Sequence, residues 1–247
     1  MDRLTVLGLL IAFGSVVLGQ WLGGGSLAIL LNVHAFLIVV GGTIGVVMLQ
    51  SPWNIFAGAI RHLAWAFFPP RYSLDELSSQ LQIWGASVRY HGFLSLEEEY
   101  QNEPNDFCQQ GLALLIDGID TASLQEVLEQ RMDVEQQRLE CYARIYESMG
   151  GYSPTIGILG AVLGLIQAMS FLDNPDQLGS GIAVAFVATI YGVGFANLLY
   201  LPIANKLRQI FYQYSVYQDM VVTGIVSISR AETSLILERR LNVFLSE

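Results

Sequence analysis

SMGGYSPTIGILGAVLGLIQAMSFL, residues 148–172, decides the fold, because it runs for 25 residues without a charged side chain. A helix needs about 20 residues to cross the hydrocarbon core of a bilayer, which is about 30 Å thick. Gly157, Gly160 and Gly164 would each cost a helix in water roughly 1 kcal/mol relative to alanine. In a membrane, small residues instead let neighbouring helices approach closely. The stretch therefore predicts a membrane-spanning helix.

The small residues of this stretch share one face of the predicted helix. They are Ser153, Gly157, Ala161, Gly164 and Ala168. Pro154 lies inside the run, where it removes a backbone donor and favours a bend. We expect a smooth packing face next to a point of flexure.

The composition of the whole chain agrees with a membrane protein. Its 247 residues are 53% hydrophobic and 14% charged, whereas soluble domains are about 25% charged. The net charge of −10 argues against a nucleic-acid partner, which requires a basic surface. Cys108 and Cys141 are too far apart in sequence for a metal-binding motif, so we expect no bound metal. We expect both in the cytoplasm, on grounds given below, and therefore as reduced thiols.

Three further uncharged stretches predict membrane spans at residues 4–22, 33–50 and 181–203. We expect turns at 23–26 and 173–180 to join the spans into two hairpins. The fourth span repeats the smooth face of the third, through Gly181, Ala185, Ala188, Gly192 and Ala196.

The region between the second and third spans has the pattern of a soluble helical domain. Three capping boxes predict helix starts there, at Ser73 with Glu76, Ser95 with Glu98 and Ser123 with Glu126. The last of these helices is expected to continue into the third span. The predicted fold is an all-α membrane protein, divided into residues 1–50 (spans 1 and 2), 51–147 (helical domain), 148–203 (spans 3 and 4) and 204–247 (helical tail).

The basic residues predict the orientation in the membrane. All 12 lie before the first span, between the second and third spans, or after the fourth, and the two hairpin loops contain none. Because basic loops stay in the cytoplasm, we expect the 51–147 domain and both termini on that side.

The spans contain no acidic side chain, and their only basic group is His34. An ion pathway usually has an intramembrane carboxylate, so a carboxylate that binds an ion here would come from another chain. Polar groups of the third and fourth spans, such as Thr189 and Tyr191, are suited to a wet path or, alternatively, to bonds with their own helix. His34 is a proton sensor or a neutral interfacial histidine. No enzyme motif is present, and we predict no catalytic residue and no cofactor.

Four motifs of the sequence resemble the MotA/PomA family of flagellar motor stator proteins, which is related to ExbB/TolQ. They are YSPTIGILGAVLGLI (152–166), AVAFVATIYGVGFAN (183–197), LPIANKL (201–207), and Arg89 followed by GFLSLE (92–97). The resemblance covers nearly the whole chain. It implies a bacterial inner-membrane complex in which five subunits surround two copies of a single-span, peptidoglycan-binding, MotB-like partner.

The resemblance also implies roles for individual residues. Ion flow through an aspartate of the partner would turn the ring against the rotor protein FliG. Arg89 and Glu97, with the adjacent Glu98, match rotor-facing charges, and Pro154 and Pro202 match prolines that couple ion flow to movement. Residues expected along the ion path or facing the partner are Pro154, Gly157, Ala161, Gly164, Thr189 and Tyr191. This chain departs from the family pattern at Tyr90, where a second basic residue is common, and around residues 230–234, where Gly, Asn and Pro are common.

The expected ion is a proton. Sodium-using relatives have a threonine where this chain has Ala161, and a missing hydroxyl removes one oxygen that could replace sodium's hydration. Three alternatives remain: an ExbB/TolQ-like channel subunit, a solute transporter component and a passive scaffold. Two spans before the soluble region and the match around Arg89 favour the stator over the first, and the lack of symmetry between the two halves disfavours the second.

Overall fold

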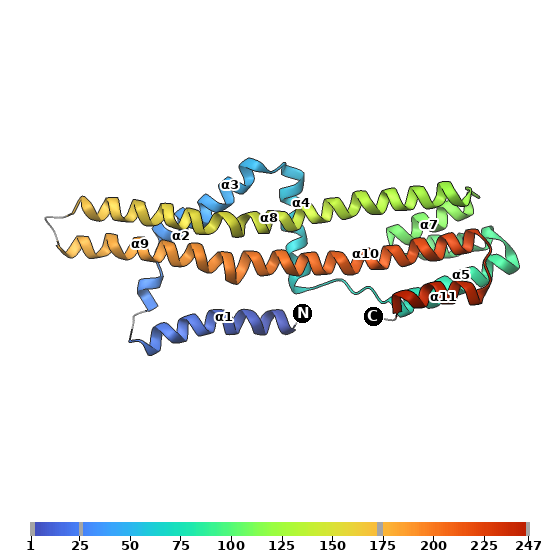
Figure 1. Cartoon of the computed structure of the whole chain (residues 1–247), viewed down its shortest axis with the longest axis horizontal. Helices are drawn as coiled ribbons and strands as arrows, with labels where there is room; N and C mark the ends of the chain where they lie inside the picture. Colours follow the sequence, from blue (N-terminus) through green and yellow to red (C-terminus); the bar gives the residue numbers. More distant parts are fainter. Residues whose placement is uncertain (1–2, 25–26, 172–174, 246–247) are drawn as a thin grey trace. The chain divides into compact units, whose positions relative to one another are not determined.

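The computed structural model describes residues 3–24, 27–171 and 175–245, and within these ranges the chain forms helices and turns but no strand (Figure 1). The α-helices are α1 (Arg3–Leu22), α2 (Val33–Phe36), α3 (Gly42–Gln50), α4 (Trp53–Phe67), α5 (Leu74–His91), α6 (Glu97–Asn102), α7 (Asp106–Ile116), α8 (Thr121–Met169), α9 (Pro175–Phe195), α10 (Leu201–Ser229) and α11 (Ser234–Leu245). Short 3-10 helices are η1 (Leu27–Leu30) and η3 (Phe93–Leu96), and π-helical segments are η2 (Leu37–Gly41) and η4 (Ala196–Tyr200).

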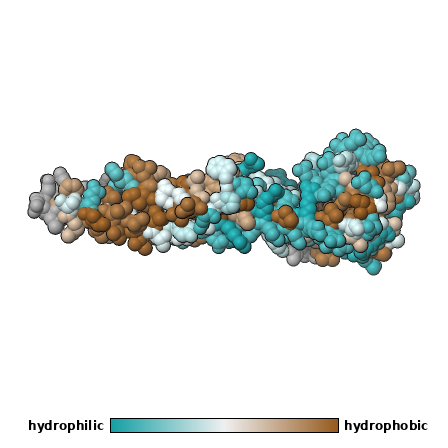
Figure 2. All heavy atoms as spheres, turned by 90° about the horizontal axis from the view of Figure 1, so that it is seen from above, coloured by the Kyte–Doolittle hydropathy of each residue, from teal (hydrophilic) through white to brown (hydrophobic). Residues whose placement is uncertain are grey.

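Four helical stretches are long and apolar enough to cross a membrane, as the sequence predicted. They are Leu4–Leu22, Val33–Gln50, and parts of Thr121–Met169 and Gly181–Ser229. Figure 2 shows hydrophobic side chains covering much of the surface toward the left of the view, and hydrophilic ones more frequent toward the right. The 49 residues of α8 span about 73 Å at 1.5 Å per residue, which is more than twice the thickness of a hydrocarbon core of about 30 Å.

The predicted turns lie partly outside the described residues. Positions 25–26 of the first turn and 173–174 of the second are not described. The second turn is shorter than predicted, because α9 already begins at Pro175. Proline is favoured in the first turn of a helix, where its missing N–H would have no intrahelical partner.

Pro154 and Pro202 both lie inside helical stretches. Helix α8 continues through Pro154 without a break. Pro202 follows η4, in which the backbone N–H of Leu201 donates to the carbonyl of Ala196, five residues earlier. Because proline cannot donate to the carbonyl four residues before it, a wider turn here is a common way to accommodate the ring.

The chain divides into two compact units. The first combines Met1–Pro69 with Leu139–Ile210, and the second combines Pro70–Arg138 with Phe211–Glu247. Helices α8 and α10 contribute to both, so each unit joins segments that the sequence analysis assigned to separate functional regions. The functional division at residues 50, 147 and 203 stays a prediction.

The second unit has its own hydrophobic core. Trp84 and Leu81 of α5, Phe107 of α7 and Ile225 of α10 are fully buried in it, together with Leu241 of α11. Gly224 lets α5 pack closely, because a Cβ there would lie 2.5 Å from a methyl group of Leu81. The apolar side chains Leu77, Leu81, Trp84 and Val88 of α5 recur at intervals of three and four residues, and the core buries all of them.

Only one of the three predicted capping boxes forms the predicted cap. The Ser73 hydroxyl accepts a hydrogen bond from the backbone N–H of Glu76, as predicted. The prediction at Ser95 was wrong: this residue lies inside η3, and its hydroxyl donates to the carbonyl of Gly92. The prediction at Ser123 was also wrong, because the carboxylate of Asp120 accepts from the N–H groups of Ala122 and Ser123 and starts α8 three residues earlier.

The turn after α10 has an alanine in a conformation that favours glycine. Ala231 has φ +52°, and the N–H of Ala231 donates to the carbonyl of Ile228 while that of Glu232 donates to Ser227. These two bonds and the left-handed residue form a Schellman motif, in which the left-handed position is usually glycine because a Cβ there is sterically costly.

We expect Ala231→Gly to stabilise the protein by roughly 0.5–1 kcal/mol, since relief of a left-handed Cβ outweighs the added freedom of the unfolded chain. Thermal unfolding of the purified chain in detergent should show a rise of about 2 °C. Ala231→Val is the matched comparison and should lower the midpoint. An unchanged or lower midpoint in Ala231→Gly would contradict this account of the turn.

Candidate functional site

The small-residue faces of α8 and α9 pack against each other. A Cβ on Gly157 would lie 2.9 Å from the carbonyl oxygen of Ala188 and 3.0 Å from Cα of Gly192. A Cβ on Gly164 would lie 2.8 Å from the backbone nitrogen of Ala185. Backbone atoms cannot move aside as a flexible side chain can, so these glycines permit a contact that no larger residue would allow.

This contact changes the interpretation of the two smooth faces. The family resemblance implies that Gly157 and Gly164 lie along the ion path or face the partner, yet both also pack against α9 within this chain. Gly157 and Gly164 are buried there. Their close packing against α9 is therefore explained without a partner, and the roles along the ion path or facing the partner stay predictions for these glycines as for Ala161 and Thr189.

Ala161 and Thr189 are more accessible than the glycines. Ala161 is half-buried, and Thr189 is exposed. The Thr189 hydroxyl donates to the carbonyl of Ala185, four residues back, at 3.3 Å. Thr189 also lines an apolar cavity of about 690 Å³ between α1, α2 and α9. It is therefore bonded to its own helix and open to a group from outside the chain.

Tyr191 has a position that the sequence did not indicate. Its hydroxyl donates to the carbonyl of Leu30 and accepts from the N–H of Asn32 at 3.3 Å. Its ring lies 6.2 Å from that of Phe36 and 5.5 Å from that of Phe195. These contacts hold the connection between the first two spans against α9.

Ser153 is the polar side chain that stands out in the contact between α8 and α9. It is fully buried, and its hydroxyl is one of two buried side-chain atoms that have no hydrogen-bond partner among the described residues. It lies directly before Pro154, which is half-buried. A buried unsatisfied hydroxyl of this kind is suited to an ordered water molecule.

The predicted rotor-facing charges in the second unit differ in their contacts. Arg89 at the end of α5 donates to the carbonyl of Glu232 at 2.9 Å and to the hydroxyl of Ser234 at 2.6 Å. Glu97 and Glu98, in the first turn of α6, are exposed. The two glutamates are available to a partner, whereas the guanidinium of Arg89 already holds the turn between α10 and α11.

Arg208 forms an ion-pair network that the sequence pattern did not indicate. Its guanidinium contacts Glu140 at 3.1 Å and also pairs with Glu147, so that it ties α10 to α8 within the first unit. The hydrogen bond from Arg208 holds the pKa of Glu147 below its ordinary value. Charged residues 61 to 68 positions apart in sequence carry no local signal of pairing.

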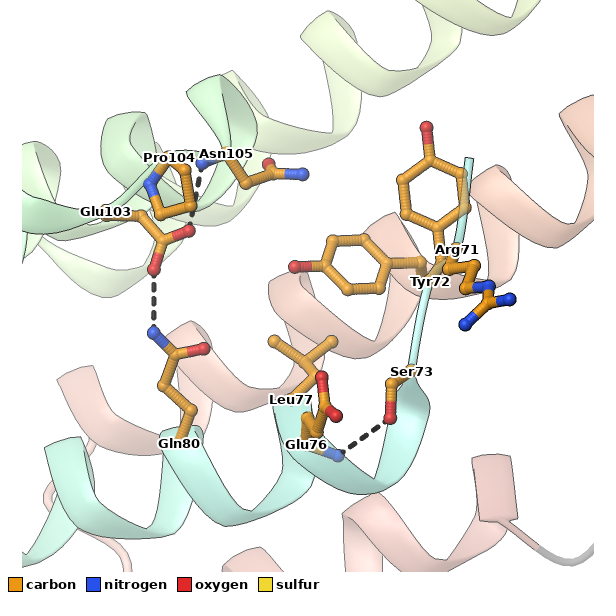
Figure 3. A pocket seen from close by; sticks show the side chains of 10 residues that line it. Arg71, Tyr72, Ser73, Glu76, Leu77, Gln80, Glu103, Pro104 and Asn105 are labelled. Atoms are coloured by element: carbon orange, nitrogen blue, oxygen red, sulfur yellow. Dashed lines mark hydrogen bonds between the residues drawn. The ribbon is translucent and has the colours of Figure 1, made fainter. Parts of the chain in front are cut away.

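A cavity of about 410 Å³ in the second unit is lined partly by polar residues that form hydrogen bonds with one another. Figure 3 shows Gln80 donating to the carboxylate of Glu103, which also accepts from the N–H of Asn105. Nearby, burial raises the pKa of the Cys108 thiol to about 12. These groups hold α5 near the start of α7, and the buried thiol is poorly suited to nucleophilic chemistry.

Family models match both parts of the chain. Residues 6–86 match the model described as the Motility protein A N-terminal domain, and residues 99–219 match the MotA/TolQ/ExbB proton channel family. Motility protein A of Bacillus subtilis (strain 168) is 30% identical over 247 residues, covering 99% of this chain and 91% of the relative. Chemotaxis protein PomA of Vibrio alginolyticus is 30% identical over 247 residues, covering 100% and 96%.

The fold of this chain is also similar to solved structures of related proteins. The MotAB structure of C. jejuni matches with a TM-score of 0.93 and 30% identity, covering 100% of this chain and 97% of that chain. The flagellar MotAB stator complex from Bacillus subtilis matches with a TM-score of 0.88 and 30% identity, covering 99% and 96%. The similarity extends over the spans and the helices of both units, and the chain belongs to the motility protein A family of flagellar stator proteins.

Proposed function

We propose that this chain is a stator subunit that, together with a MotB-like single-span partner, couples ion flow across the inner membrane to torque on the flagellar rotor. The observation that carries the proposal is the full-length likeness to chains of MotAB complexes. The absence of any acidic or basic side chain other than His34 from the spans at 4–22, 33–50, 148–172 and 181–203 is consistent with it. An ion that crosses here needs a carboxylate from a second protein.

We place the second unit and both termini in the cytoplasm. The distribution of the 12 basic residues supports this orientation. Gln125 offers a simple test, because it lies near the start of α8 in the second unit. A cysteine introduced there should react with a membrane-impermeant reagent only in opened cells, and labelling of intact cells would contradict the orientation.

Individual residues have proposed roles in the coupled movement. Ala161 and Thr189 face the carboxylate of the partner, and the unsatisfied hydroxyl of Ser153 supplies a polar contact on the path. Pro154 and Pro202 are the points at which α8 and α10 bend during this movement. On the rotor side, the exposed Glu97 and Glu98 contact FliG, and Arg89 orients the surface beside them.

The remaining features of the proposal follow the family. The ring contains five copies of this chain around two copies of the partner, and the complex needs no cofactor and performs no enzymatic reaction. The transported ion is a proton, because Ala161 lacks the hydroxyl that would help to replace a sodium ion's hydration.

The second candidate function is an ExbB/TolQ-like channel subunit. One of the two matching family models covers that group as well. The match of residues 6–86 to the Motility protein A N-terminal model favours the stator. Two spans that precede the second unit's first helix, α5, support the same choice.

Deletion and complementation in the native host test the function. We expect the deletion strain to lose swimming in soft agar, and swimming to return only when this chain and a single-span partner with an intact intramembrane aspartate are both expressed. Replacement of that aspartate by asparagine should abolish the ion flux of the co-expressed pair. Full swimming without the chain, or a defect in outer-membrane uptake instead of swimming, would contradict the proposal.

The choice of ion is tested in the same strain. Swimming should continue when sodium is replaced by potassium and stop when the proton gradient is collapsed. Loss of swimming on sodium removal, with the proton gradient intact, would refute proton use.

A further inference from the structure

Ser153 of α8 differs from other hydroxyl-bearing residues in the helices of this chain. Its side chain is fully buried, and its hydroxyl has no hydrogen-bond partner among the described residues. Several other helical hydroxyls donate to the carbonyl three or four residues back, as do those of Thr43, Ser79, Thr155 and Thr189. A buried polar group without a partner is costly, because it has lost its bonds to water. An accessible arrangement that gives the Ser153 hydroxyl an acceptor is therefore favoured.

The carbonyl of Gly150 is an acceptor of this kind. It lies three residues before Ser153, the spacing at which Thr155 bonds to Tyr152. In a regular helix it would accept from the N–H four residues later, but that residue is Pro154, which has no N–H. A hydroxyl without an acceptor and a carbonyl without its regular donor thus lie within one turn of α8. Rotation about the Cα–Cβ bond of Ser153 between staggered positions is the movement that can join them.

A bond from Ser153 to Gly150 would change the bend of α8. Proline favours a bend, because its ring crowds the preceding turn and one bond of the helix is missing. Serine hydroxyls that bond back to the helix often bend it further. In the conformation described, the Ser153 hydroxyl is unbonded and α8 continues through Pro154 without a break. The unbonded hydroxyl therefore accompanies a continuous helix.

Gly150 also connects this turn to the second proline. A Cβ on Gly150 would lie 2.6 Å from a methyl carbon of Leu201, so the two residues are in close contact. Leu201 directly precedes Pro202, and its N–H closes the wide turn of η4 by donating to the carbonyl of Ala196. A change in the turn at Gly150 therefore acts on the residue through which α10 accommodates Pro202.

We propose that Ser153 is a positioning residue for the bend at Pro154: its hydroxyl turns from the unbonded position to the carbonyl of Gly150, and this bond stabilises a more bent α8. The contact with Leu201 passes the change to the turn before Pro202. The role in movement rests on the proposed stator function, whereas the bend is a property of the chain itself. One net hydrogen bond changes the ratio of two conformations roughly fivefold, so the balance responds to modest changes in the surroundings.

Spin labels at residues 144 and 162 of the full-length chain measure the bend. Arg144 and Val162 are exposed and are 18 residues apart, which is about five helical turns, so both labels lie on one face of α8 with Pro154 between them. The two backbone positions are about 27 Å apart in a straight helix, and a bend moves labels on one face together or apart. Cys108 and Cys141 are first replaced by alanine. Labelled chain is mixed with unlabelled chain, so that pulsed EPR reports distances within one chain.

We expect two distance populations when residue 153 is serine. Ser153→Ala should lower the more bent population roughly fivefold relative to the straight one. It should not lower the midpoint of thermal unfolding, because the hydroxyl that it removes is unbonded in the conformation described. Ser153→Thr keeps a hydroxyl that can bond back to the helix and should keep both populations. If the added methyl group prevents folding, Ser153→Cys, whose thiol is a weak donor, should give a result between serine and alanine.

Two comparisons isolate the bond to Gly150. Pro154→Ala restores the N–H that serves this carbonyl, so Ser153→Ala should have no further effect on the distances in that background. Ser170→Ala removes the hydroxyl of a serine directly after α8, which already donates to the carbonyl of Gln167. This variant should leave both distance populations unchanged.

Three results of the distance measurement would overturn the proposal. The first is a single population when residue 153 is serine. The second is an unchanged distribution in Ser153→Ala, which is the result expected if an ordered water molecule permanently satisfies the hydroxyl. The third is an equally large effect of Ser153→Ala in the Pro154→Ala background.

Swimming tests the role in movement separately. Ser153→Ala should reduce swimming speed in a strain that depends on this chain, and Ser170→Ala should not. Full speed in Ser153→Ala would overturn the role of Ser153 in movement. Failure of the proposed function itself would appear differently, as full swimming of the deletion strain, and would leave the distances in the purified chain as they are.

Discussion

Gly164→Leu is expected to abolish swimming while the chain still inserts into the membrane. A Cβ added to Gly164 would lie only 2.8 Å from the backbone nitrogen of Ala185. The three further carbons of a leucine side chain have no space unless α8 and α9 separate. Forced overpacking of this kind typically costs 1–3 kcal/mol, and in this case it displaces two whole spans. Swimming in soft agar and the amount of chain in the membrane fraction measure the two parts of the prediction.

Comparison with Gly151→Ala and Ala161→Leu identifies the contact that fails. A Cβ on Gly151, in the same helix, meets nothing within 4 Å, so Gly151→Ala should not lower the unfolding midpoint of the purified chain. Gly164→Leu should lower that midpoint even without a partner, since the broken contact lies within the chain. Ala161→Leu should change the midpoint less and still stop swimming, because residue 161 is expected to face the partner. A normal midpoint in Gly164→Leu would contradict the packing of α8 on α9.

Arg89→Glu is expected to destabilise the second unit as well as to reduce torque. The variant loses the hydrogen bonds to the Glu232 carbonyl and the Ser234 hydroxyl, and hydrogen bonds from charged groups contribute on the order of 1.5–3 kcal/mol each when buried. Because these are partly exposed, we expect a total loss of about 2 kcal/mol, seen as a lower midpoint in thermal unfolding. Arg89→Lys should recover only part of it, since an ammonium group cannot reproduce the two-pronged geometry.

Charge reversal on the rotor distinguishes Arg89 from the glutamates. Glu97→Lys and Glu98→Lys alter exposed side chains and should leave the unfolding midpoint unchanged. Their swimming defects should be partly restored by opposite charge changes on the rotor, whereas that of Arg89→Glu should not be. Restoration of Arg89→Glu by a rotor charge, together with an unchanged midpoint, would show that Arg89 contacts the rotor directly.

The spans and several helix boundaries were predictable because their causes are local. Twenty uncharged residues are sufficient to indicate a membrane helix, and the hydroxyl of Ser73 caps a helix that starts at the next residue. Where two local signals compete, the sequence misleads. Asp120 and Ser123 are both good caps, and the earlier one starts α8.

Long-range contacts were not predictable from one sequence. The spacing of the small residues predicted the smooth faces of α8 and α9. It does not indicate which helix each face packs against. The same holds for Arg89, since its contacts lie 143 and 145 residues away, and for the pairing of Arg208 with Glu140 and Glu147. The family resemblance supplied roles for residues, and the structure supplies the contacts through which those roles can be tested.

The packing of glycine against backbone in α8 and α9 has a mechanical consequence. Ordinary helix pairs interlock, because side-chain ridges of one helix fit the grooves of the other. Around Gly157 and Gly192 there are few ridges to interlock, and each glycine faces the backbone of the opposite helix. A contact of this kind resists separation but opposes sliding only weakly. Sliding of α8 along α9 is therefore opposed mainly by contacts that involve side chains. The contacts of Tyr191 with Leu30 and Phe36 are of this kind.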